Sequence, residues 1–248
     1  MLNPSTLDLI SSIPTDGQIV VLTGAGVSQE SGVATFRDSN GLWENHRIEE
    51  VATPEAYQRN PKLVQDFYNA RRRQVVTVHP NKAHQALVEL EQRWKGKFLL
   101  VTQNVDDLHD RAGSKNLIHM HGELLKVHCT KCRHICQHTN DVTIDMSCVS
   151  CNAKGCVRPH IVWFGEMPLE MDRIEQALSH CDLFIAIGTS GEVYPAAGFM
   201  QLARMAGART LELNLQSTGR SNHFHEGVYG PAGTVVPEVV SALVQAAG

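Results

Sequence analysis

The sequence predicts an α/β fold in which helices cover both faces of a parallel sheet and a smaller helical, metal-binding module is attached. Three observations support this prediction. Short apolar runs alternate with segments of helical periodicity, which is typical of a parallel sheet covered on both faces. The first apolar run ends in a glycine turn. Six of the seven cysteines lie in one stretch, from Cys129 to Cys156, which does not fit the alternation.

The predicted strands are apolar runs that end in small or polar residues, at positions 19–22, 98–102, 183–188 and 211–215. The predicted helices lie between them. Ala83, Ala86, Leu87 and Leu90 recur at helical spacing, and the segments 195–206 and 237–247 each begin with proline, a common first residue of a helix. Ligands of parallel sheets gather at the carboxyl ends of the strands, so the residues after each strand are site candidates.

Two segments are assigned to the smaller module because they interrupt the alternation. Residues 38–78 are polar and helix-forming, and residues 123–157 hold the clustered cysteines. We expect residues 1–37, 79–122 and 158–248 to form the larger nucleotide-binding domain. A cleft between the two modules is then the natural place for an active site.

The composition is that of an ordinary globular protein, with 248 residues, of which 42% are hydrophobic and 19% charged. No apolar run approaches the roughly 20 residues that span a bilayer, so no membrane association is expected. The net charge of −4 disfavours nucleic-acid binding, since residues 71–73 form the main basic run. The N-terminal segment resembles neither a secretory signal nor an Arg-rich leader, so a cytoplasmic location is expected. The sequence predicts no particular oligomeric state.

A glycine turn follows the first predicted strand, with the sequence Thr23-Gly24-Ala25-Gly26-Val27-Ser28. A helix that begins near Ser28 would direct its positive end at a phosphate. However, Gln29 stands where a dinucleotide fingerprint has its third glycine, and no strand ending in a ribose-binding acid follows about 20 residues later. The turn therefore predicts a nucleotide site unlike that of hydride-transferring enzymes. Alone, it also fits a plain strand-to-helix corner.

The cysteines predict a metal site. Cys129-x-x-Cys132 and Cys148-x-x-Cys151 have the spacing of a four-thiolate zinc site. Four protein ligands leave no open position for catalysis, so one structural Zn²⁺ is expected. Cys156 is an alternative to Cys151 as the fourth ligand.

Polar residues follow the predicted strand at 98–102. Gln103, Asn104 and Asp106 could hydrogen-bond ribose hydroxyls and a carboxamide. Further along the chain, His121 precedes a glycine, and a histidine that titrates near neutrality can act as a general base toward a sugar hydroxyl. The neighbouring histidines at 109 and 119 are alternative bases.

In their order along the chain, these motifs resemble those of sirtuins. The matching motifs cover roughly residues 18 to 240 and include Gly24 to Ser28, Phe36-Arg37, Thr102 to Asp106, His121-Gly122, the four cysteines, Val162 to Glu166, Gly188-Thr189-Ser190 and Asn214-Leu215. The resemblance implies an NAD-dependent protein lysine deacylase with a Rossmann-like NAD-binding domain and a small zinc-binding module. NAD would be consumed as a co-substrate.

The resemblance also implies roles for individual residues. His121 would be the general base, Asn104 and Gln103 would orient the ribose, and Asp106 would hold the nicotinamide carboxamide. Other NAD contacts would come from Gly24, Ala25, Gly26, Ser28, Glu30, Thr35, Phe36, Arg37, Trp43, Val105, Gly188, Thr189, Ser190, Asn214, Leu215, Gln216 and Ala232. An acylated peptide would pair as a strand with the segment that contains Val162, Phe164 and Gly165.

The reaction that the resemblance implies needs no protein nucleophile. The acyl oxygen of the modified lysine attacks the ribose carbon as nicotinamide leaves. His121 then takes a proton from a ribose hydroxyl, and lysine departs from 2′-O-acyl-ADP-ribose. Two alternatives are a protein mono-ADP-ribosyltransferase and a zinc-ribbon binding module without enzymatic activity.

Tyr68 and Arg71 lie three residues apart on one face of a predicted helix, so a hydroxyl and a guanidinium could hold one small carboxylate. Alone, Arg71 also fits a solvated charged face. The pair resembles that of class III sirtuins, which remove succinyl and malonyl groups. Ala52, a small residue in the acyl channel, and Thr35 also match that class. The resemblance therefore implies activity on succinyl-, malonyl- and acetyl-lysine.

Overall fold

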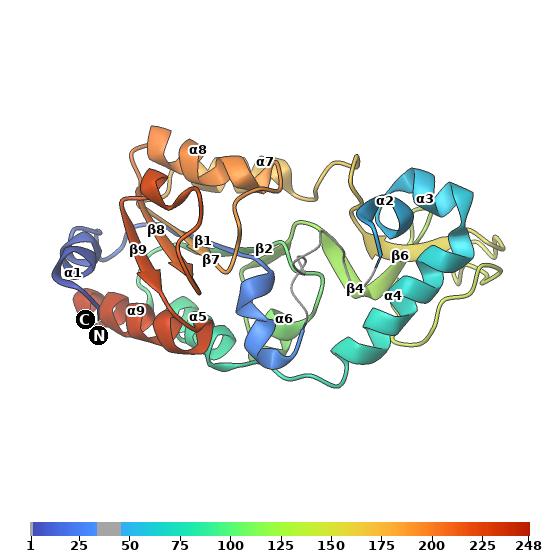
Figure 1. Ribbon diagram of the computed structural model, residues 1–248, viewed down its shortest axis with the longest axis horizontal. Coiled ribbons are helices and arrows are strands. Elements are labelled where there is room, and N and C mark those ends of the chain that lie inside the picture. Colours follow the sequence, from blue (N-terminus) through green and yellow to red (C-terminus); the bar gives the residue numbers. More distant parts are fainter. Residues whose placement is uncertain (1, 34–45) are drawn as a thin grey trace.

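The computed structural model describes residues 2–33 and 46–248 and contains a six-stranded parallel sheet (Figure 1). The strand order is β3-β2-β1-β7-β8-β9. The strands are β1 (Ile19–Thr23), β2 (Phe98–Thr102), β3 (Leu117–His119), β7 (Leu183–Ile187), β8 (Arg209–Asn214) and β9 (Glu226–Tyr229). β1 lies in the interior of the sheet, paired with β2 on one side and with β7 on the other.

The predicted strands are confirmed. All residues of β1, β2 and β7 are buried, which explains why these strands appear as continuous apolar runs and not as alternating patterns. Two strands of this sheet, β3 and β9, were not predicted from the sequence. These two edge strands are short and only partly buried, so their hydrophobic pattern is weak.

Helices cover both faces of the six-stranded sheet, as predicted (Figure 1). On one face lie α1 (Pro4–Ser11), α5 (Lys82–Arg93) and α9 (Ala232–Ala247), and on the other lie α7 (Met171–Leu178) and α8 (Phe199–Met205). Because strand side chains alternate between faces, Val21 belongs to the first hydrophobic core while Val20 and Leu22 belong to the second.

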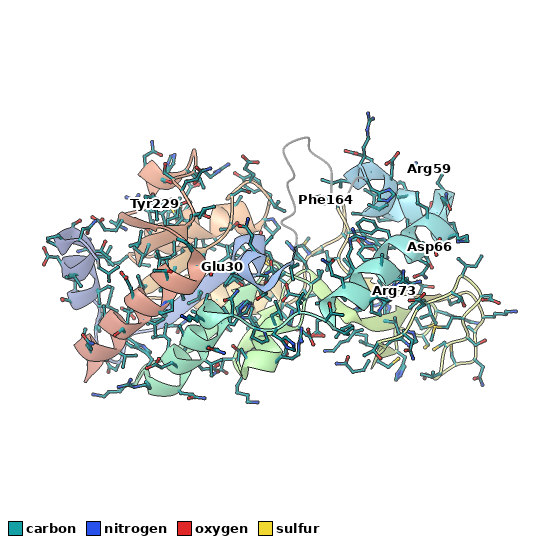
Figure 2. All side chains as sticks on the ribbon, turned by 60° about the horizontal axis from the view of Figure 1, so that its bottom comes forward. Glu30, Arg59, Asp66, Arg73, Phe164 and Tyr229 are labelled. Atoms are coloured by element: carbon teal, nitrogen blue, oxygen red, sulfur yellow. The ribbon has the colours of Figure 1, made fainter. Side chains whose placement is uncertain are left out.

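A smaller antiparallel sheet has the strand order β5-β4-β6, formed by β4 (Gly122–Cys129), β5 (Ile135–Gln137) and β6 (Val157–Ile161). The helices α2 (Ile48–Val51), α3 (Pro54–Arg59) and α4 (Pro61–Val75) pack on it through a third core, which includes Tyr68 and Trp163. In Figure 2, Asp66 and Arg73 lie on this part, Glu30 and Tyr229 lie on the other, and Phe164 lies between them. The module boundary predicted at residue 158 falls inside β6, and the division into two modules stays a prediction.

One predicted helix boundary is wrong. The helix expected to begin at Pro237 begins at Ala232, so this proline lies inside α9. Its missing N–H removes one intrahelical hydrogen bond. Burial of Val235, Val236 and Val239 against the sheet extends the helix across that position.

The predicted helix at 195–206 consists of the 3₁₀ turn η3 (Ala196–Gly198) followed by α8. The remaining elements are α6 (Leu108–Ala112) and the 3₁₀ turns η1 (Ala25–Val27), η2 (Gln29–Ser31) and η4 (Ser221–His223). Within the described residues, no helix combines the length and the apolar character needed to cross a bilayer.

The packing of α5 against α9 and the sheet can be tested at Leu90, which is fully buried in the first core. We expect Leu90→Ala to lower the free energy of unfolding by about 2–5 kcal/mol, because the lost methyl groups leave a cavity. Denaturant unfolding followed by circular dichroism measures this change. Gln85→Ala, at an exposed position of the same helix, should change the free energy by less than about 0.5 kcal/mol. Similar effects of the two substitutions would contradict this packing.

Candidate functional site

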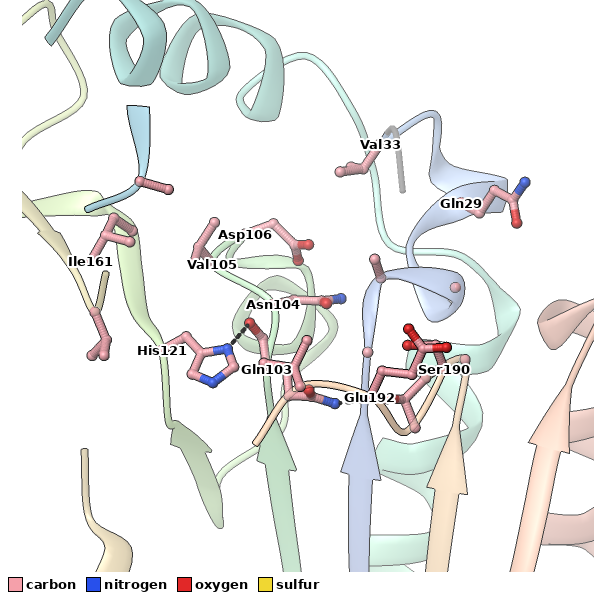
Figure 3. Close-up of a pocket in the computed structure, with 18 of the residues that line it drawn as sticks. Gln29, Val33, Gln103, Asn104, Val105, Asp106, His121, Ile161, Ser190 and Glu192 are labelled. Atoms are coloured by element: carbon pink, nitrogen blue, oxygen red, sulfur yellow. Dashed lines mark hydrogen bonds between the residues drawn. The ribbon is translucent and has the colours of Figure 1, made fainter. Parts of the chain in front are cut away.

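A cavity of about 620 Å³ lies at the carboxyl ends of β1, β2, β7 and β8, and α4 and the segment after β6 line its other side (Figure 3). It brings together many of the predicted site residues from distant parts of the chain. Those that line it are Gly24, Ala25, Gly26, Ala52, Tyr68, Arg71, Gln103, Asn104, Val105, Asp106, His121, Val162, Phe164, Gly165, Gly188, Thr189, Ser190, Asn214, Leu215 and Gln216.

The glycine turn after β1 packs directly on the turn after β7. The backbone N–H of Gly26 donates to the carbonyl of Gly188 at 2.9 Å, and a Cβ on Gly26 would lie 2.7 Å from the Gly188 Cα. Any side chain at position 26 would therefore collide with backbone. The chain continues into the 3₁₀ turns η1 and η2, so the α-helix expected to begin near Ser28 is not formed.

Ser28 faces away from the cavity and fixes two polar residues that line it. Its hydroxyl donates to Oδ2 of Asp106 at 3.1 Å and accepts a hydrogen bond from the Asn104 side-chain amide at 3.0 Å. Ser28 is fully buried, and burial raises the pKa of the Asp106 carboxyl. The carboxyl and the amide are thus held in place by one hydroxyl.

Two buried histidines lie behind this group. His84 Nε2 is 3.5 Å from the Ser28 hydroxyl, and His109 Nε2 is 3.0 Å from the hydroxyl of Thr23. Burial lowers the pKa of His84 to about 4 and lowers the pKa of His109 well below its ordinary value. Both rings are therefore neutral at physiological pH, and neither lines the cavity.

His121 lines the cavity and points into it from the connection between β3 and β4 (Figure 3). Its Nδ1 lies 3.1 Å from the carbonyl oxygen of Gln103. Because a carbonyl can only accept, Nδ1 carries the hydrogen and Nε2 is left as the basic nitrogen. Burial lowers the pKa of His121, which keeps this nitrogen unprotonated at neutral pH.

His119 has different surroundings. Its Nε2 lies 2.8 Å from Asp110 and 3.7 Å from Glu123. Burial acts to lower the pKa of His119, but these two carboxylates outweigh it and the pKa is raised. Neither His119 nor His109 lines the cavity, so of the three candidate bases His121 alone reaches it.

The far end of the cavity is lined by the turns after β7 and β8. The Asn214 side chain donates to the carbonyl of Thr189 at 2.8 Å, and the Gln103 amide donates to the Thr189 hydroxyl at 3.1 Å. Glu30 and Ala232 line an adjoining cavity of about 280 Å³. The Glu30 carboxylate accepts from the N–H of Gly233 at 3.0 Å, at the beginning of α9.

Tyr68 and Arg71 line the cavity from α4, and Ala52 lines it beside them. Tyr68 is fully buried, and burial raises the pKa of its hydroxyl, so the phenol stays protonated. Arg71 donates to the carbonyl of Phe67 at 2.8 Å, and its guanidinium lies 3.7 Å from the centre of the Phe67 ring.

The segment after β6 forms backbone hydrogen bonds with two other residues that line the cavity, His121 and Ala52. Val162 N–H donates to the carbonyl of His121 at 2.9 Å, and Phe164 N–H donates to that of Ala52 at 3.0 Å. Four other predicted NAD contacts lie outside the described residues: Thr35, Phe36, Arg37 and Trp43.

The predicted cysteine cluster is confirmed. The sulfur atoms of Cys129, Cys132, Cys148 and Cys151 all lie within 4.8 Å of one another. The Cys129–Cys151 and Cys132–Cys148 sulfur pairs are each 3.7 Å apart. This fits a tetrahedral zinc site, in which Zn–S bonds of about 2.3 Å place the sulfurs roughly 3.8 Å apart. The alternative ligand, Cys156, is not part of the cluster and instead contacts the Lys154 carbonyl.

Three residues that shape the site were not among the predicted site residues. His84 lies behind Ser28, Trp163 donates a hydrogen bond to Tyr68, and the buried carboxylate of Glu212 accepts from Thr218 and Tyr229. Trp163 stands inside one of the quoted motifs, which was a usable signal. The roles of His84 and Glu212 depend on long-range contacts, which leave no local pattern in the sequence.

Comparison with known proteins gives consistent matches. The model of the Sir2 family matches residues 24–195. A relative from Escherichia coli (strain K12) named NAD-dependent protein deacylase is 56% identical over 230 residues, covering 92% of this chain and 82% of the relative. A relative from Leishmania major named NAD-dependent protein deacylase SIR2rp3 is 57% identical over 232 residues, covering 92% of this chain and 96% of the relative.

Solved structures give the same result. A complex of a Sir2 homolog with NAD superposes with a TM-score of 0.89 at 38% identity, covering 100% of this chain and 96% of the other. A structure of Sir2 bound to acetylated peptide has a TM-score of 0.82 at 27% identity, covering 97% of this chain and 98% of the other.

The choice of the fourth zinc ligand can be tested by substitution. We expect the purified protein to contain about one zinc ion per chain, Cys151→Ser to lose it, and Cys156→Ser to retain it, because only Cys151 belongs to the cluster. Elemental analysis by mass spectrometry measures the metal content. Zinc retained in Cys151→Ser but lost in Cys156→Ser would reverse the assignment.

Proposed function

Since this chain belongs to the Sir2 family and is an NAD-dependent protein deacylase, we propose that it removes succinyl and malonyl as well as acetyl groups from lysine side chains. The products would be nicotinamide and 2′-O-acyl-ADP-ribose. One observation carries the proposal for acidic acyl groups: Tyr68 and Arg71 line the same cavity as His121 and the glycine turn.

The part of the cavity lined by Ala52, Tyr68 and Arg71, here called its acyl end, suits a short acyl chain that ends in a carboxylate. The Tyr68 phenol stays protonated and can donate a hydrogen bond, and the Arg71 guanidinium carries a positive charge. Both come from one face of α4, and hydrogen bonds between charged groups are about twice as strong as neutral ones. The small side chain of Ala52 leaves room for the acyl chain beside them. An acetyl group fits the same channel but makes neither contact.

NAD would bind along the carboxyl ends of the strands. Gly24 and Gly26 line the cavity, and the pyrophosphate would lie against their backbone. Asn104 and Asp106, held by Ser28, would contact the ribose and the nicotinamide amide. Glu30, Ala232 and the turns after β7 and β8 would contact the adenosine half. NAD supplies the electrophilic ribose carbon and the nicotinamide leaving group.

His121 would act as the general base. Its basic Nε2 faces the cavity, and the carbonyl of Gln103 fixes the tautomer by accepting from Nδ1. A base must be neutral to accept a proton, and the lowered pKa of His121 keeps it neutral at physiological pH.

Acylated lysines in proteins are the substrates, as the deacylase activity requires. The peptide would lie against Val162, Phe164 and Gly165 and pair with the backbone, a mode of binding that selects little among flanking residues. A cytoplasmic location is part of the proposal, because none of the seven cysteines forms a disulfide and four of them are placed to bind a metal ion, as expected in a reducing compartment.

The acyl proposal is tested by incubating the protein with NAD and matched acetyl-, succinyl- and malonyl-lysine peptides, with every product identified by mass spectrometry. We expect free nicotinamide, free lysine peptide and the matching acyl-ADP-ribose from all three peptides. Release of acetyl alone would refute the acidic-acyl proposal. ADP-ribose attached to protein in place of acyl-ADP-ribose would favour mono-ADP-ribosyl transfer.

Arg71 should affect acidic substrates selectively. We expect Arg71→Met to reduce kcat/KM for desuccinylation roughly 10- to 150-fold and to spare deacetylation, because a charge-assisted hydrogen bond contributes about 1.5–3 kcal/mol. Steady-state kinetics on matched peptides measures both values. Arg73→Met is the matched control, since Arg73 lies on the same helix but pairs with Asp141. Equal losses on both substrates after Arg71→Met would remove the case for a carboxylate site.

The pH dependence of kcat/KM should identify the base. Protonation inactivates a general base, so activity falls as the pH drops through its pKa. Burial lowers the pKa of His121, and we therefore expect the midpoint of the acidic limb below 6.5. A midpoint above 6.5 would point to His119, whose pKa is raised.

Substitution of the base is a separate test. His121→Tyr should abolish turnover in a protein that remains folded by circular dichroism.

A further inference from the structure

Trp163 forms a buried hydrogen bond with Tyr68, which lines the acyl end of the cavity. Its indole Nε1–H donates to the hydroxyl oxygen of Tyr68 at 3.0 Å, and the two residues are 2% and 0% exposed. An indole N–H is a donor with no capacity to accept. The Tyr68 oxygen is therefore the acceptor, and the phenol hydrogen is directed away from Trp163.

The indole itself is held rigidly. The Arg158 guanidinium lies 3.4 Å from the centre of the Trp163 ring, and the Tyr57 ring packs 5.2 Å from it. The Glu166 carboxylate accepts two hydrogen bonds from Arg158, at 2.8 and 2.9 Å, and a third from the Trp163 backbone N–H at 2.8 Å. One carboxylate thus fixes both the backbone of Trp163 and the cation that covers its ring.

This residue joins two parts of the proposed site. Trp163 and its neighbours Val162 and Phe164 line the cavity where the substrate peptide would lie, and the Trp163 side chain reaches Tyr68 on α4. A hydroxyl that accepts a hydrogen bond becomes a better donor through its own hydrogen, because the two bonds polarise each other. A Tyr68 hydroxyl oriented in this way can hydrogen-bond only an acyl group that carries an acceptor at its end.

We propose that Trp163 is a positioning residue for acyl selectivity, which orients the Tyr68 hydroxyl as a hydrogen-bond donor to the terminal carboxylate of the acyl group. This inference rests on the proposed activity on acidic acyl groups. Acetyl-lysine carries no terminal carboxylate, so its removal does not use this contact. Trp163 acts through the Tyr68 hydroxyl, so its effect is confined to substrates with an acidic acyl group.

The test compares kinetics of wild-type protein and Trp163→Phe on matched succinyl- and acetyl-lysine peptides. We expect the ratio of kcat/KM for the succinyl to the acetyl peptide to fall about 3- to 10-fold, mainly through a higher KM for the succinyl peptide. Tyr57→Phe is the matched control. It removes a hydroxyl from the same aromatic cluster, one that contacts Val157 and Gln65 and does not line the cavity, and it should leave the ratio unchanged.

The same substitution in Tyr68→Phe protein shows whether Trp163 acts by orienting the Tyr68 hydroxyl or only by packing. In Tyr68→Phe protein the hydroxyl is absent, so the added Trp163→Phe substitution should change both substrates equally. If Trp163→Phe does not fold, replacement of Trp163 by 3-benzothienylalanine keeps the bicyclic ring, removes the N–H and should give the same change in ratio.

Three results would overturn the inference. The first is a folded Trp163→Phe protein that removes succinyl groups with an unchanged succinyl-to-acetyl ratio of kcat/KM. This result would refute the role of Trp163 and leave the proposed function standing. A selective loss that persists in the Tyr68→Phe background would also refute it. Absence of desuccinylation by the wild-type protein would refute the proposed function and this inference together.

Discussion

The close approach of two backbone turns shapes the whole site. The turn after β1 touches the turn after β7, and the Gly26 N–H donates to the Gly188 carbonyl. Side chains at either position would push the two turns apart, since a Cβ on Gly26 would lie 2.7 Å from the Gly188 Cα and a Cβ on Gly188 would lie 2.5 Å from the Val27 nitrogen. Both turns end neighbouring central strands, so their contact places the backbone of both turns at the end of the sheet, where NAD is proposed to bind.

Burial then assigns different tasks to similar side chains. His84 and His109 are enclosed, remain neutral and serve as hydrogen-bonding partners behind the cavity. His119 pairs with carboxylates, which favour its charged form. His121 is held at one nitrogen by a carbonyl and presents the other to the cavity. The same residue type can therefore be a support, a cation or a proposed base, and the surroundings decide which.

The smaller sheet and the helices packed on it contribute the residues that are proposed to contact the acyl group. The tip of this sheet has only a small hydrophobic core, around Val127 and Val142, next to the cysteine cluster. A metal that crosslinks four thiolates stabilises such a module where little apolar surface is available. Nearer the cavity, Glu166 and Arg158 hold Trp163 on Tyr68. These contacts join α4 to the segment after β6 at the proposed acyl end of the site.

The sequence by itself determined the features that depend on near neighbours: the apolar runs of β1, β2 and β7, the glycine turn, and the spacing of the cysteine pairs. It could not show that Ser28 turns inward, because its partner Asn104 lies 76 residues away. Only the tertiary structure decided that Cys151, and not Cys156, completes the cluster, and that His121 faces the cavity. These choices depend on which distant segments meet in space, and local patterns carry no record of that packing.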